Sequence, residues 1–354
     1  MRKGWEYKKL GDCTQILDSQ RKPVTKRDRK SGIYPYYGAT GIQDYVDKYI
    51  FDGRYVLVGE DGAKWSSFTQ SAFIIEGKTW VNNHAHVLRT NDFLVDSFLI
   101  YFLNYSDLDS YISGAIIRKL TQASLRNIDI PLPPKSTQLA IVSELDKINE
   151  LIRLKKEQLK DFDNLAQSLF YEMFGDPVEN EKGWEVKKLG EICEIFAGGD
   201  KPKDMCEIQN NEYIYPVIAN GEGEKGILGY TKNCRVTKEA VTIGARGASI
   251  GNCRIVKNGF TPAIRLLTLI PTGSIDCCFL YYFVKDLNYK QNGAGQAQLT
   301  VPNIKCEFIL LPPLPLQRLF AQRIEQIERE KLEVQKSIQD LETLLASRMQ
   351  YWFE

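Results

Sequence analysis

The chain has 354 residues, a formal net charge of +1 and a hydrophobic content of 43%. This length predicts two or three packed domains, and the near-neutral balance means that only local clusters of charge can indicate a partner. No run of 18 apolar residues is present and the first residues lack an apolar segment, which argues against a membrane span and a secretory signal. The eight cysteines form no C-x-x-C pair, so we expect reduced thiols, no metal site and a cytoplasmic protein.

Basic residues are concentrated in residues 21–30, where Asp28 is the only acid. Such a loop suits contacts with DNA phosphates, which supply most of the affinity and its salt dependence. A solvated surface loop is the ordinary alternative. The second half of the chain has a weaker counterpart. The predicted contacts from these two stretches are Arg21, Lys22, Lys26, Arg27, Lys201 and Lys203.

Short strands and glycine turns follow. Residues 55–58 and 240–243 read as buried strands, and each runs into a glycine turn, Gly59-Glu60-Asp61-Gly62-Ala63 in the first case and Gly244-Ala245-Arg246-Gly247-Ala248 in the second. Residues 96–104 and 275–284 read as short helices. These patterns predict β-rich α+β domains.

Reading of base edges requires side chains that can donate or accept hydrogen bonds in pairs. His84 and His86 form an H-x-H pair whose spacing predicts the same face of a strand, with no carboxylate or thiol close in sequence. A polar surface or a DNA contact is therefore favoured over a metal site. The predicted base-contact candidates are Lys64, Asn82, Asn83, His84, Arg118, Lys119, Arg246, Asn252, Arg265, Gln296 and Gln298.

A long helix is predicted between Pro133-Pro134 and Gly175-Asp176-Pro177. Its apolar residues recur at steps of four and three, as in a coiled-coil seam, and its length would be roughly 50–55 Å. Gly175 suits a left-handed C-terminal cap. The seam of this helix consists of Ile141, Leu145, Ile148, Ile152, Leu159, Phe162 and Leu169, interrupted by Lys155.

The chain is an internal duplication. Gly4-Trp5-Glu6 and the following Lys-Lys-Leu-Gly return 179 positions later from Gly183, and Pro133-Pro134 with Gln138 returns at the same offset as Pro312-Pro313 with Gln317. The polar loops of the two copies differ. The second helix carries the seam Phe320, Ile324, Ile327, Val334, Ile338, Leu341 and Leu345, interrupted by Lys331.

Two helices with matching seams predict pairing within the chain, antiparallel and with a pseudo-twofold relation. Each seam lysine is expected either to lie beside an acid such as Glu157 or Glu330 or to extend along its own stem into solvent. The predicted domains are residues 1–134, the helix 135–176, residues 177–313 and the helix 314–354.

Motifs for catalysis are absent from the sequence. Gly77-Lys78-Thr79 lacks the preceding glycine of a phosphate-binding loop, no dinucleotide fingerprint is complete, and Leu132-Pro133-Pro134 lacks the polar residue of an aminomethyltransferase tetrad. No pair of a nucleophile and a base stands out. We therefore predict a binding protein without catalytic residues.

The ordered set of Gly-Trp-Glu-x-Lys-Lys-Leu-Gly, Pro-Pro with glutamine before a long helix, and Phe174-Gly175-Asp176-Pro177 resembles the DNA-specificity subunit of type I restriction-modification systems. The resemblance covers the whole chain. It implies two target recognition domains that each read half of a bipartite site in double-stranded DNA. It also implies spacer helices that set the gap and bind two methyltransferase subunits, with restriction subunits as a further partner. S-adenosylmethionine, ATP and Mg²⁺ are expected in those partners and no cofactor in this chain.

Two alternatives stay open at this point. Within DNA binding, the chain could serve a methyltransferase alone. From another class, a coiled-coil scaffold could carry β-rich ends that bind protein or carbohydrate. The basic loop and the divergent polar loops favour DNA.

Overall fold

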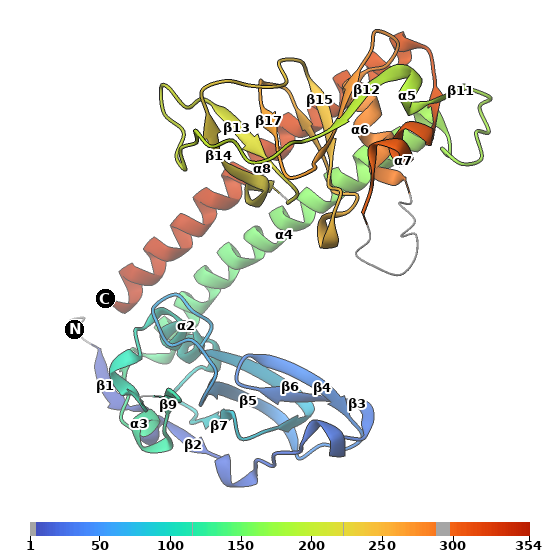
Figure 1. The fold of residues 1–354 in the computed structure, drawn as a ribbon. Helices are drawn as coiled ribbons and strands as arrows, with labels where there is room; N and C mark the ends of the chain where they lie inside the picture. The colour runs from blue at the N-terminus through green and yellow to red at the C-terminus, as the bar shows by residue number, and fades with distance from the viewer. Residues whose placement is uncertain (1–4, 115, 222, 288–297) are drawn as a thin grey trace. The chain divides into compact units, whose positions relative to one another are not determined.

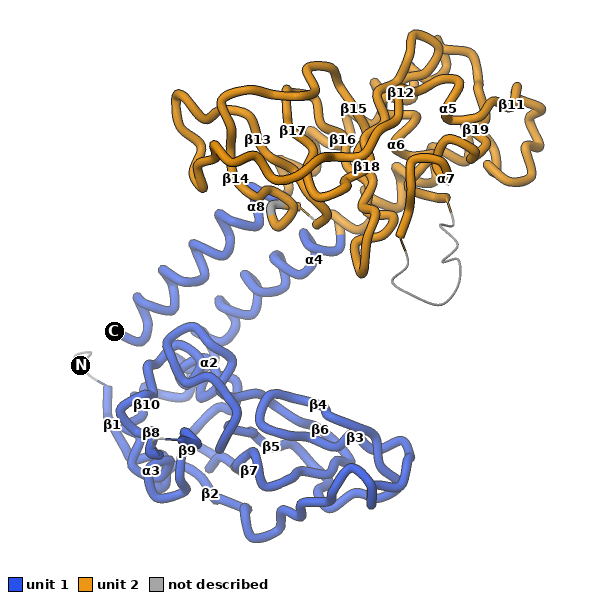
Figure 2. The backbone as a smooth tube through the Cα atoms, viewed as in Figure 1, with its two compact units in different colours: residues 1–157, 335–354 blue, residues 158–334 orange. Residues whose placement is uncertain are grey.

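The computed structural model describes residues 5–114, 116–221, 223–287 and 298–354, and its backbone divides into two compact units (Figures 1 and 2). Unit 1 comprises residues 1–157 and 335–354, and unit 2 comprises residues 158–334. Each unit thus combines one β-rich region with part of each long helix. Neither unit therefore coincides with one of the two sequence repeats.

Unit 1 is built on a six-stranded sheet with the strand order β2-β7-β5-β6-β3-β4. Two small ladders, β1-β10 and β8-β9, complete it. The elements are β1 (Glu6–Lys9), α1 (Leu10–Cys13), β2 (Thr14–Ile16), β3 (Ser31–Gly38), β4 (Gly41–Val46), β5 (Phe51–Gly59), β6 (Ala72–Val81), β7 (Ala85–Thr90), α2 (Asp96–Tyr105), β8 (Ile112–Ser113), β9 (Lys119–Leu120), α3 (Gln122–Arg126) and β10 (Asp129–Leu132).

Unit 2 has a four-stranded sheet of order β12-β18-β15-β16, a three-stranded sheet of order β14-β13-β17 and the ladder β11-β19. The elements are β11 (Glu185–Lys188), α5 (Leu189–Ile192), β12 (Cys193–Ala197), β13 (Tyr215–Ile218), β14 (Ile227–Thr231), β15 (Ala240–Ile243), β16 (Cys253–Val256), β17 (Thr261–Pro262), β18 (Leu267–Pro271), α6 (Cys277–Asp286), α7 (Val301–Cys306) and β19 (Phe308–Leu311). The predicted strands at 55–58 and 240–243 and both short helices are confirmed.

The strand register confirms the duplication and aligns the two units residue by residue. Val56 of β5 pairs with Leu88 of β7, and Val241 of β15 pairs with Leu269 of β18 in the same way. The side chains of β5 are buried on both faces: Val56 and Val58 lie in a cluster that includes residues of α2, and Leu57 lies in a second cluster. The burial explains why the central strands are uninterrupted apolar runs rather than alternating patterns.

The repeated Pro-Pro and glutamine motif has a structural role. Gln138 is fully buried, accepts a hydrogen bond from the Val95 amide at 2.9 Å and donates to the Phe93 and Pro133 carbonyls. Gln317 makes the equivalent contacts, accepting from the Asp276 amide at 2.8 Å. A buried side-chain amide must be bonded on both its oxygen and its nitrogen. This glutamine therefore joins the start of each long helix to the loop before the short helix of its unit.

The glycine of each Lys-Lys-Leu-Gly motif allows a close approach between segments. A Cβ on Gly11 would lie 3.0 Å from Cβ of Arg126 on α3, and one on Gly190 would lie 3.1 Å from Cβ of Lys305 on α7. The preceding residues pair antiparallel with the strand before each long helix, Lys9 opposite Asp129 and Lys188 opposite Phe308. The motif therefore closes the start of each β-rich region against its end.

The long helices are α4 (Lys135–Phe174) and α8 (Leu314–Phe353), each of 40 residues. At 1.5 Å per residue each is about 60 Å long, slightly more than the sequence predicts. Gly175 has a φ of +80°, which confirms the predicted left-handed cap. Among the helices of the described residues, none is long and apolar enough to cross a membrane.

The predicted seam is largely buried within each unit. Ile141, Leu145, Ile148, Ile152 and Ile338 are at most 8% exposed in unit 1, and Phe320, Ile324, Ile327 and Val334 are similarly buried in unit 2. The other predicted seam residues are half-buried: Leu159, Phe162, Leu169, Leu341 and Leu345.

The seam drifts at the ends of both helices. Phe170 is 1% exposed whereas the predicted Leu169 is half-buried, and Met349 is 6% exposed beside the half-buried Arg348. A straight helix with 3.6 residues per turn drifts from a 3.5 repeat. Near its end each helix packs against a β-rich region, so the buried stripe follows the helix rather than the heptad.

Aromatic side chains anchor the ends of the long helices. In unit 2, Phe174 packs edge-on against Phe279 of α6 with ring centroids 4.7 Å apart, and the Phe174 carbonyl accepts from Trp184 Nε1 at 2.8 Å. In unit 1, Phe353 of α8 contacts Phe98 of α2 with centroids 5.6 Å apart. The end of α4 therefore completes the core of the β-rich region that follows it in sequence. The end of α8 completes the core of the first β-rich region.

Candidate nucleic-acid interface

The two units share one backbone framework at the glycine turn that follows the central strand. The Leu120 amide donates to the Glu60 carbonyl at 2.8 Å in unit 1, and the Leu299 amide donates to the Ala245 carbonyl at 3.0 Å in unit 2. The next residues form matching β-bridges, Asp61 with Lys119 and Arg246 with Gln298. All four bridge residues except Asp61 belong to the predicted base-contact set. The fold therefore presents different side chains from the same backbone positions.

Below this turn, unit 1 contains a buried charge cluster, defined here as Asp18, Arg21, Glu60 and His86. Their side chains are 7%, 12%, 9% and 1% exposed. Arg21 donates to Glu60 Oε2, to the Ala85 carbonyl at 2.8 Å, and lies 3.3 Å from Asp18 Oδ2. Lys119 Nζ lies 2.7 Å from the other oxygen of Glu60.

His86 occupies the centre of the cluster. Its Nδ1 lies 2.6 Å from Asp18 Oδ2 and its Nε2 lies 2.7 Å from the Leu120 carbonyl. His84, by contrast, precedes β7 in a turn, is 46% exposed and contacts Asp61 at 2.5 Å. The prediction that no carboxylate stands close to the histidines is therefore wrong, because the fold brings Asp61 to His84 and brings Asp18 and Glu60 to His86. His84 lies in the turn before β7, so the strand spacing behind the same-face prediction does not apply to it.

Both carboxyl groups of the cluster titrate below their ordinary range. Burial alone raises the pKa of Asp18, but hydrogen bonds from His86 and the Val87 amide and the charge of Arg21 lower it further than burial raises it. Burial likewise raises the pKa of Glu60, and the bonds from Lys119 and Arg21 again reverse the direction. Opposite charges and donated hydrogen bonds stabilise a carboxylate relative to the neutral acid. The cluster is therefore an ionic network at neutral pH.

Unit 2 has no such network at the aligned positions. Ala197, Leu267 and Ala245 of unit 2 correspond to Asp18, His86 and Glu60 of unit 1. Ala197 pairs with Leu267 across β12 and β18, and Ala245 follows Gly244 at the end of β15. All three side chains in unit 2 are small or apolar. The same sheet is therefore built with a charged support in one copy and an apolar support in the other.

The basic loop contains two kinds of cation. Lys22, Lys26, Arg27 and Lys30 are exposed. Arg29 instead stacks on Tyr36 with its guanidinium 4.1 Å from the ring centroid and pairs with Asp44 at 3.2 Å. Arg21 is buried in the charge cluster, so we remove it from the set of proposed phosphate contacts.

The remaining candidates of unit 1 fall into exposed and buried groups. Lys64 and Arg118 line a surface pocket of about 460 Å³ beside Trp65, and Ile116 and Ile117 at its edge are 97% and 69% exposed. Asn83 is also exposed. Asn82 is only 2% exposed, and its side chain bonds Gln43 and the His84 amide. Asn82 thus holds the turn and is not presented to a ligand.

The candidates of unit 2 are exposed: Lys201, Lys203, Arg246, Asn252, Arg265 and Gln298. Arg246 donates to Gln298 Oε1 at 3.4 Å, so these two side chains are brought together. Arg265 has a φ of +58°, a left-handed conformation, and its amide donates to the Gly198 carbonyl at 3.1 Å. Gln296 lies outside the described residues.

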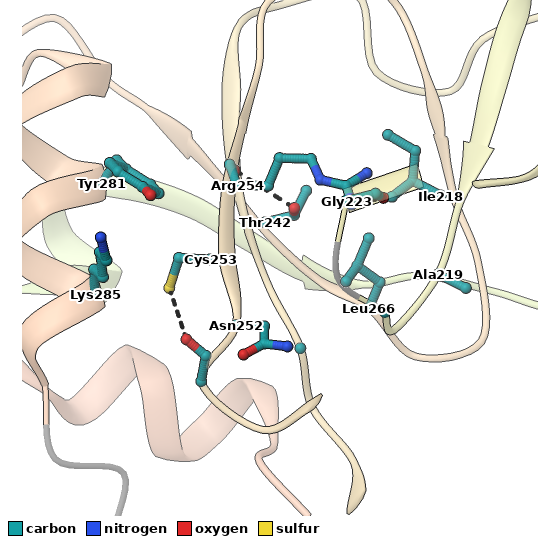
Figure 3. Close-up of a pocket in the computed structure, with 13 residues that line it drawn as sticks. Ile218, Ala219, Gly223, Thr242, Asn252, Cys253, Arg254, Leu266, Tyr281 and Lys285 are labelled. Carbon is teal, nitrogen blue, oxygen red and sulfur yellow. Dashed lines mark hydrogen bonds between the residues drawn. The ribbon is translucent and has the colours of Figure 1, made fainter. Parts of the chain in front are cut away.

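A polar pocket of about 370 Å³ opens beside Asn252 in unit 2, between β15, β16 and α6 (Figure 3). Thr242, Arg254 and Lys285 line it, and Figure 3 shows the Asn252 amide among them. Burial lowers the pKa of Arg254. Sequence reasoning did not single out Thr242, Arg254 or Lys285.

The aligned positions of unit 1 carry other side chains. The cross-strand pair of Thr242 and Arg254 corresponds to Leu57 and Phe73. Lys285 corresponds to Asn104, whose side chain makes hydrogen bonds of 2.8–3.0 Å with the backbone of Ser71 and Ala72. A comparison of the copies at the correct register, rather than of either copy alone, would have revealed this difference. The polar lining by Thr242 and Arg254 is therefore a property of the second copy.

Comparisons with known proteins agree with the architecture. The family described as "Type I restriction modification DNA specificity domain" matches residues 2–161 and again residues 181–343, and the chain belongs to this family. A putative type I specificity subunit of Mycoplasma pneumoniae is 28% identical over 88% of this chain and 87% of its own length. A putative type I restriction enzyme specificity subunit of Haemophilus influenzae is 41% identical over 41% of this chain and 38% of its own length.

Solved structures show the same fold. The type I restriction-modification S subunit of Mycoplasma genitalium superposes with a TM-score of 0.61 over 99% of this chain and 96% of that chain, at 15% identity. A chain from a study of assembly of the type I restriction-modification system gives a TM-score of 0.62 at 20% identity, over 100% of this chain and 98% of that one.

Proposed function

We propose that this chain is the DNA-specificity subunit of a type I restriction-modification complex and that each unit reads one half of a bipartite, asymmetric site. The observation that carries the proposal is the pair of equivalent bridges, Asp61 with Lys119 and Arg246 with Gln298, which place different polar side chains on one repeated backbone. Different donors and acceptors at the same place suit two different half-sites. Exposed cations of the basic loop would neutralise phosphates.

The long helices are proposed to pair as an antiparallel coiled coil. Contacts inside each unit support this. In unit 1, Arg348 bonds Glu144 and Lys156 lies 2.8 Å from Glu342. In unit 2, Lys331 lies 2.8 Å from Asp163, and Phe170 and Phe320 have centroids 5.7 Å apart.

The order of these contacts has the sense of an antiparallel pair, since the α8 number falls as the α4 number rises. Lys331, which interrupts the seam, is held by Asp163 and Glu328 rather than by Glu330. The ammonium of this lysine is therefore paired with two acids.

The helices would also bind two methyltransferase subunits. Leu165 and Leu344 occupy equivalent positions of the two repeats and are 51% and 45% exposed. An exposed leucine repeated at the same helical position suits two copies of one partner. Those partners would hold S-adenosylmethionine, ATP and Mg²⁺, and a restriction subunit would join them. The chain itself is proposed to be non-catalytic.

The test is to express the chain with its methyltransferase subunits and map methylated adenines across the genome. A bipartite motif with a fixed gap is expected. Binding to duplex DNA should weaken steeply as salt rises. Affinity that is independent of salt would instead favour the scaffold with protein- or carbohydrate-binding ends.

The role of the helices as a ruler has its own test. Inserting or deleting residues beside Lys155 in α4 should change the length of the gap and leave both half-sites unchanged. A change in a half-site with a constant gap would contradict this role.

A further inference from the structure

Glu60 connects three segments of unit 1 that carry proposed DNA contacts. Its Oε2 accepts from Arg21 at the start of the basic loop, and its Oε1 accepts from Lys119 of the 112–120 hairpin at 2.7 Å. Its own backbone belongs to the glycine turn, where the Glu60 amide donates to the His84 carbonyl at 2.8 Å. Displacing this one carboxylate would therefore release both Arg21 of the basic loop and Lys119 of β9, while the backbone bond to His84 would remain.

The fold does not require this charged support. Unit 2 builds the same strand register with Ala197, Ala245 and Leu267 at the corresponding places. Taking charges out of water is costly, and replacing a buried ion network by well-packed apolar groups is often neutral or stabilising. Stability alone is therefore a poor explanation for a network in which Asp18, Arg21 and Glu60 are largely buried in one copy.

A metal ion is not a satisfactory occupant either. One ligand atom each from Asp18, Glu60 and His86 lies within 4.8 Å of the others. Both oxygens of Glu60 are already bonded to cations, and both nitrogens of His86 face oxygen atoms. A metal would therefore have to displace Arg21 and Lys119 from Glu60.

The geometry points to Glu60 as a positioning residue that sets the base preference of unit 1. It does so by holding Lys119, with the nearby exposed Ile116 and Ile117, in one arrangement relative to the basic loop. This inference rests on the proposed function. Lys119 keeps 42% of its side chain exposed while it is held by Glu60, so its ammonium is oriented and still accessible to DNA. A group held in one rotamer loses less side-chain entropy on binding, which raises affinity. Its donor is also fixed in place, so it favours only a base edge that presents an acceptor there.

Two variants of the full chain, each co-expressed with the methyltransferase subunits, test the inference. Glu60→Gln keeps the shape and removes the charge. The quadruple variant Asp18→Ala/Arg21→Met/Glu60→Ala/His86→Leu gives unit 1 an apolar support like that of unit 2, which keeps the test valid if the single variant fails to fold. Methylated adenines are mapped for each, and Tm is measured on the purified complexes.

The half-site of unit 2 is the internal reference. It is assigned with Arg246→Ala/Gln298→Ala, which should alter the bases of one half-site only. For both variants of the charge cluster, we expect about tenfold more methylation at DNA sites that differ by one base in the half-site read by unit 1. The half-site read by unit 2 and the gap should stay unchanged. Leu125→Ala, a core truncation in α3, is the matched control: it should lower Tm without changing either half-site.

The outcomes are separable. If the wild-type chain directs no bipartite methylation, the proposed function fails. If wild type does so but both cluster variants retain the same base preferences, with or without a fall in Tm, Glu60 is merely structural and this inference is overturned.

Discussion

Glu60 and Lys119 form a half-exposed ion pair, with Oε1 and Nζ 2.7 Å apart, in which the carboxylate is 9% exposed and the lysine 42%. The pair joins a buried ionic network to the surface that is proposed to meet DNA. At the equivalent bridge of unit 2, Gln298 lies opposite Arg246, and among the described residues no buried carboxylate lies beneath it. The two surfaces therefore differ in how firmly their polar groups are held as well as in which groups they present.

The charge cluster should make the stability of unit 1 sensitive to acid. The native pKa values of Asp18 and Glu60 lie below their ordinary values of 3.8 and 4.5, so their stabilising contribution is complete above about pH 5 and is lost as pH falls through the native values. At neutral pH, Glu60→Gln should cost about 2 kcal/mol, or roughly 4–8 °C in Tm. This difference from wild type should shrink below pH 4. A Tm difference that is constant from pH 7 to pH 3 would show that the carboxylate is not stabilised in its ionised form.

Neutralising the basic loop should reduce the salt dependence of DNA binding. The variant Lys26→Gln/Arg27→Gln/Lys30→Gln removes three exposed cations, and each lost phosphate contact should lower the slope of log affinity against log salt by about 0.9. The measurement is a titration of duplex DNA by the assembled complex at several salt concentrations. Lys160→Gln, an exposed lysine on α4, serves as the control and should leave the slope unchanged. An unaltered slope in the triple variant would place the phosphate contacts elsewhere.

The polar pocket of unit 2 can be closed with the residues of unit 1. Thr242→Leu/Arg254→Phe installs the pair found at Leu57 and Phe73 and should fill the cavity without loss of Tm. If Arg254 contacts a phosphate, this double variant should lower the slope of log affinity against log salt by about one. Its affinity for DNA should drop equally for all sequences. Arg254→Lys is the matched control because it keeps the charge. Equal affinity and slope in the closed variant would mean that the pocket takes no part in DNA binding.

The last turn of α8 should contribute to the stability of unit 1. Phe353 contacts Phe98, Phe102 and Tyr105 of α2 with ring centroids 5.6–5.8 Å apart. Since Phe353 is only half-buried, Phe353→Ala should cost about 2 kcal/mol, less than a full core truncation. Amide hydrogen exchange should accelerate in α2 and not in α6 of unit 2. The exposed Leu344→Ala is the control, and exchange that rises equally in both units would contradict a local anchoring role.

Much of the fold could be predicted from the sequence because it depends on regular patterns. The 179-residue repeat, the heptad seam of α4 and α8, and the apolar runs of β5 and β15 are properties of spacing and composition, which local geometry converts directly into elements. The left-handed Gly175 and the glutamine after Pro-Pro are likewise visible in the sequence, although the role of Gln138 became clear only when its bonds to Phe93 and Val95 were known.

The candidate site was predicted less well because it is assembled from distant segments. Exposed residues such as Lys26, Arg27, Arg118 and Arg246 lie in polar loops, and polarity alone located them. Arg21 and Asn82 have the same residue types but are buried, since a hydrogen-bonding partner contributed by another strand decides whether a polar side chain turns inward.

The sequence by itself determined that the chain is a duplicated protein with two β-rich regions and two long helices, because periodicity and repetition are encoded locally. Only the tertiary structure decided that His86 lies between Asp18 and Glu60. It also decided that Arg254 lines a pocket at the position that Phe73 occupies in unit 1, and that Phe353 completes the unit 1 core. These relationships depend on strand register and on contacts between residues far apart in the chain. No local pattern specifies either.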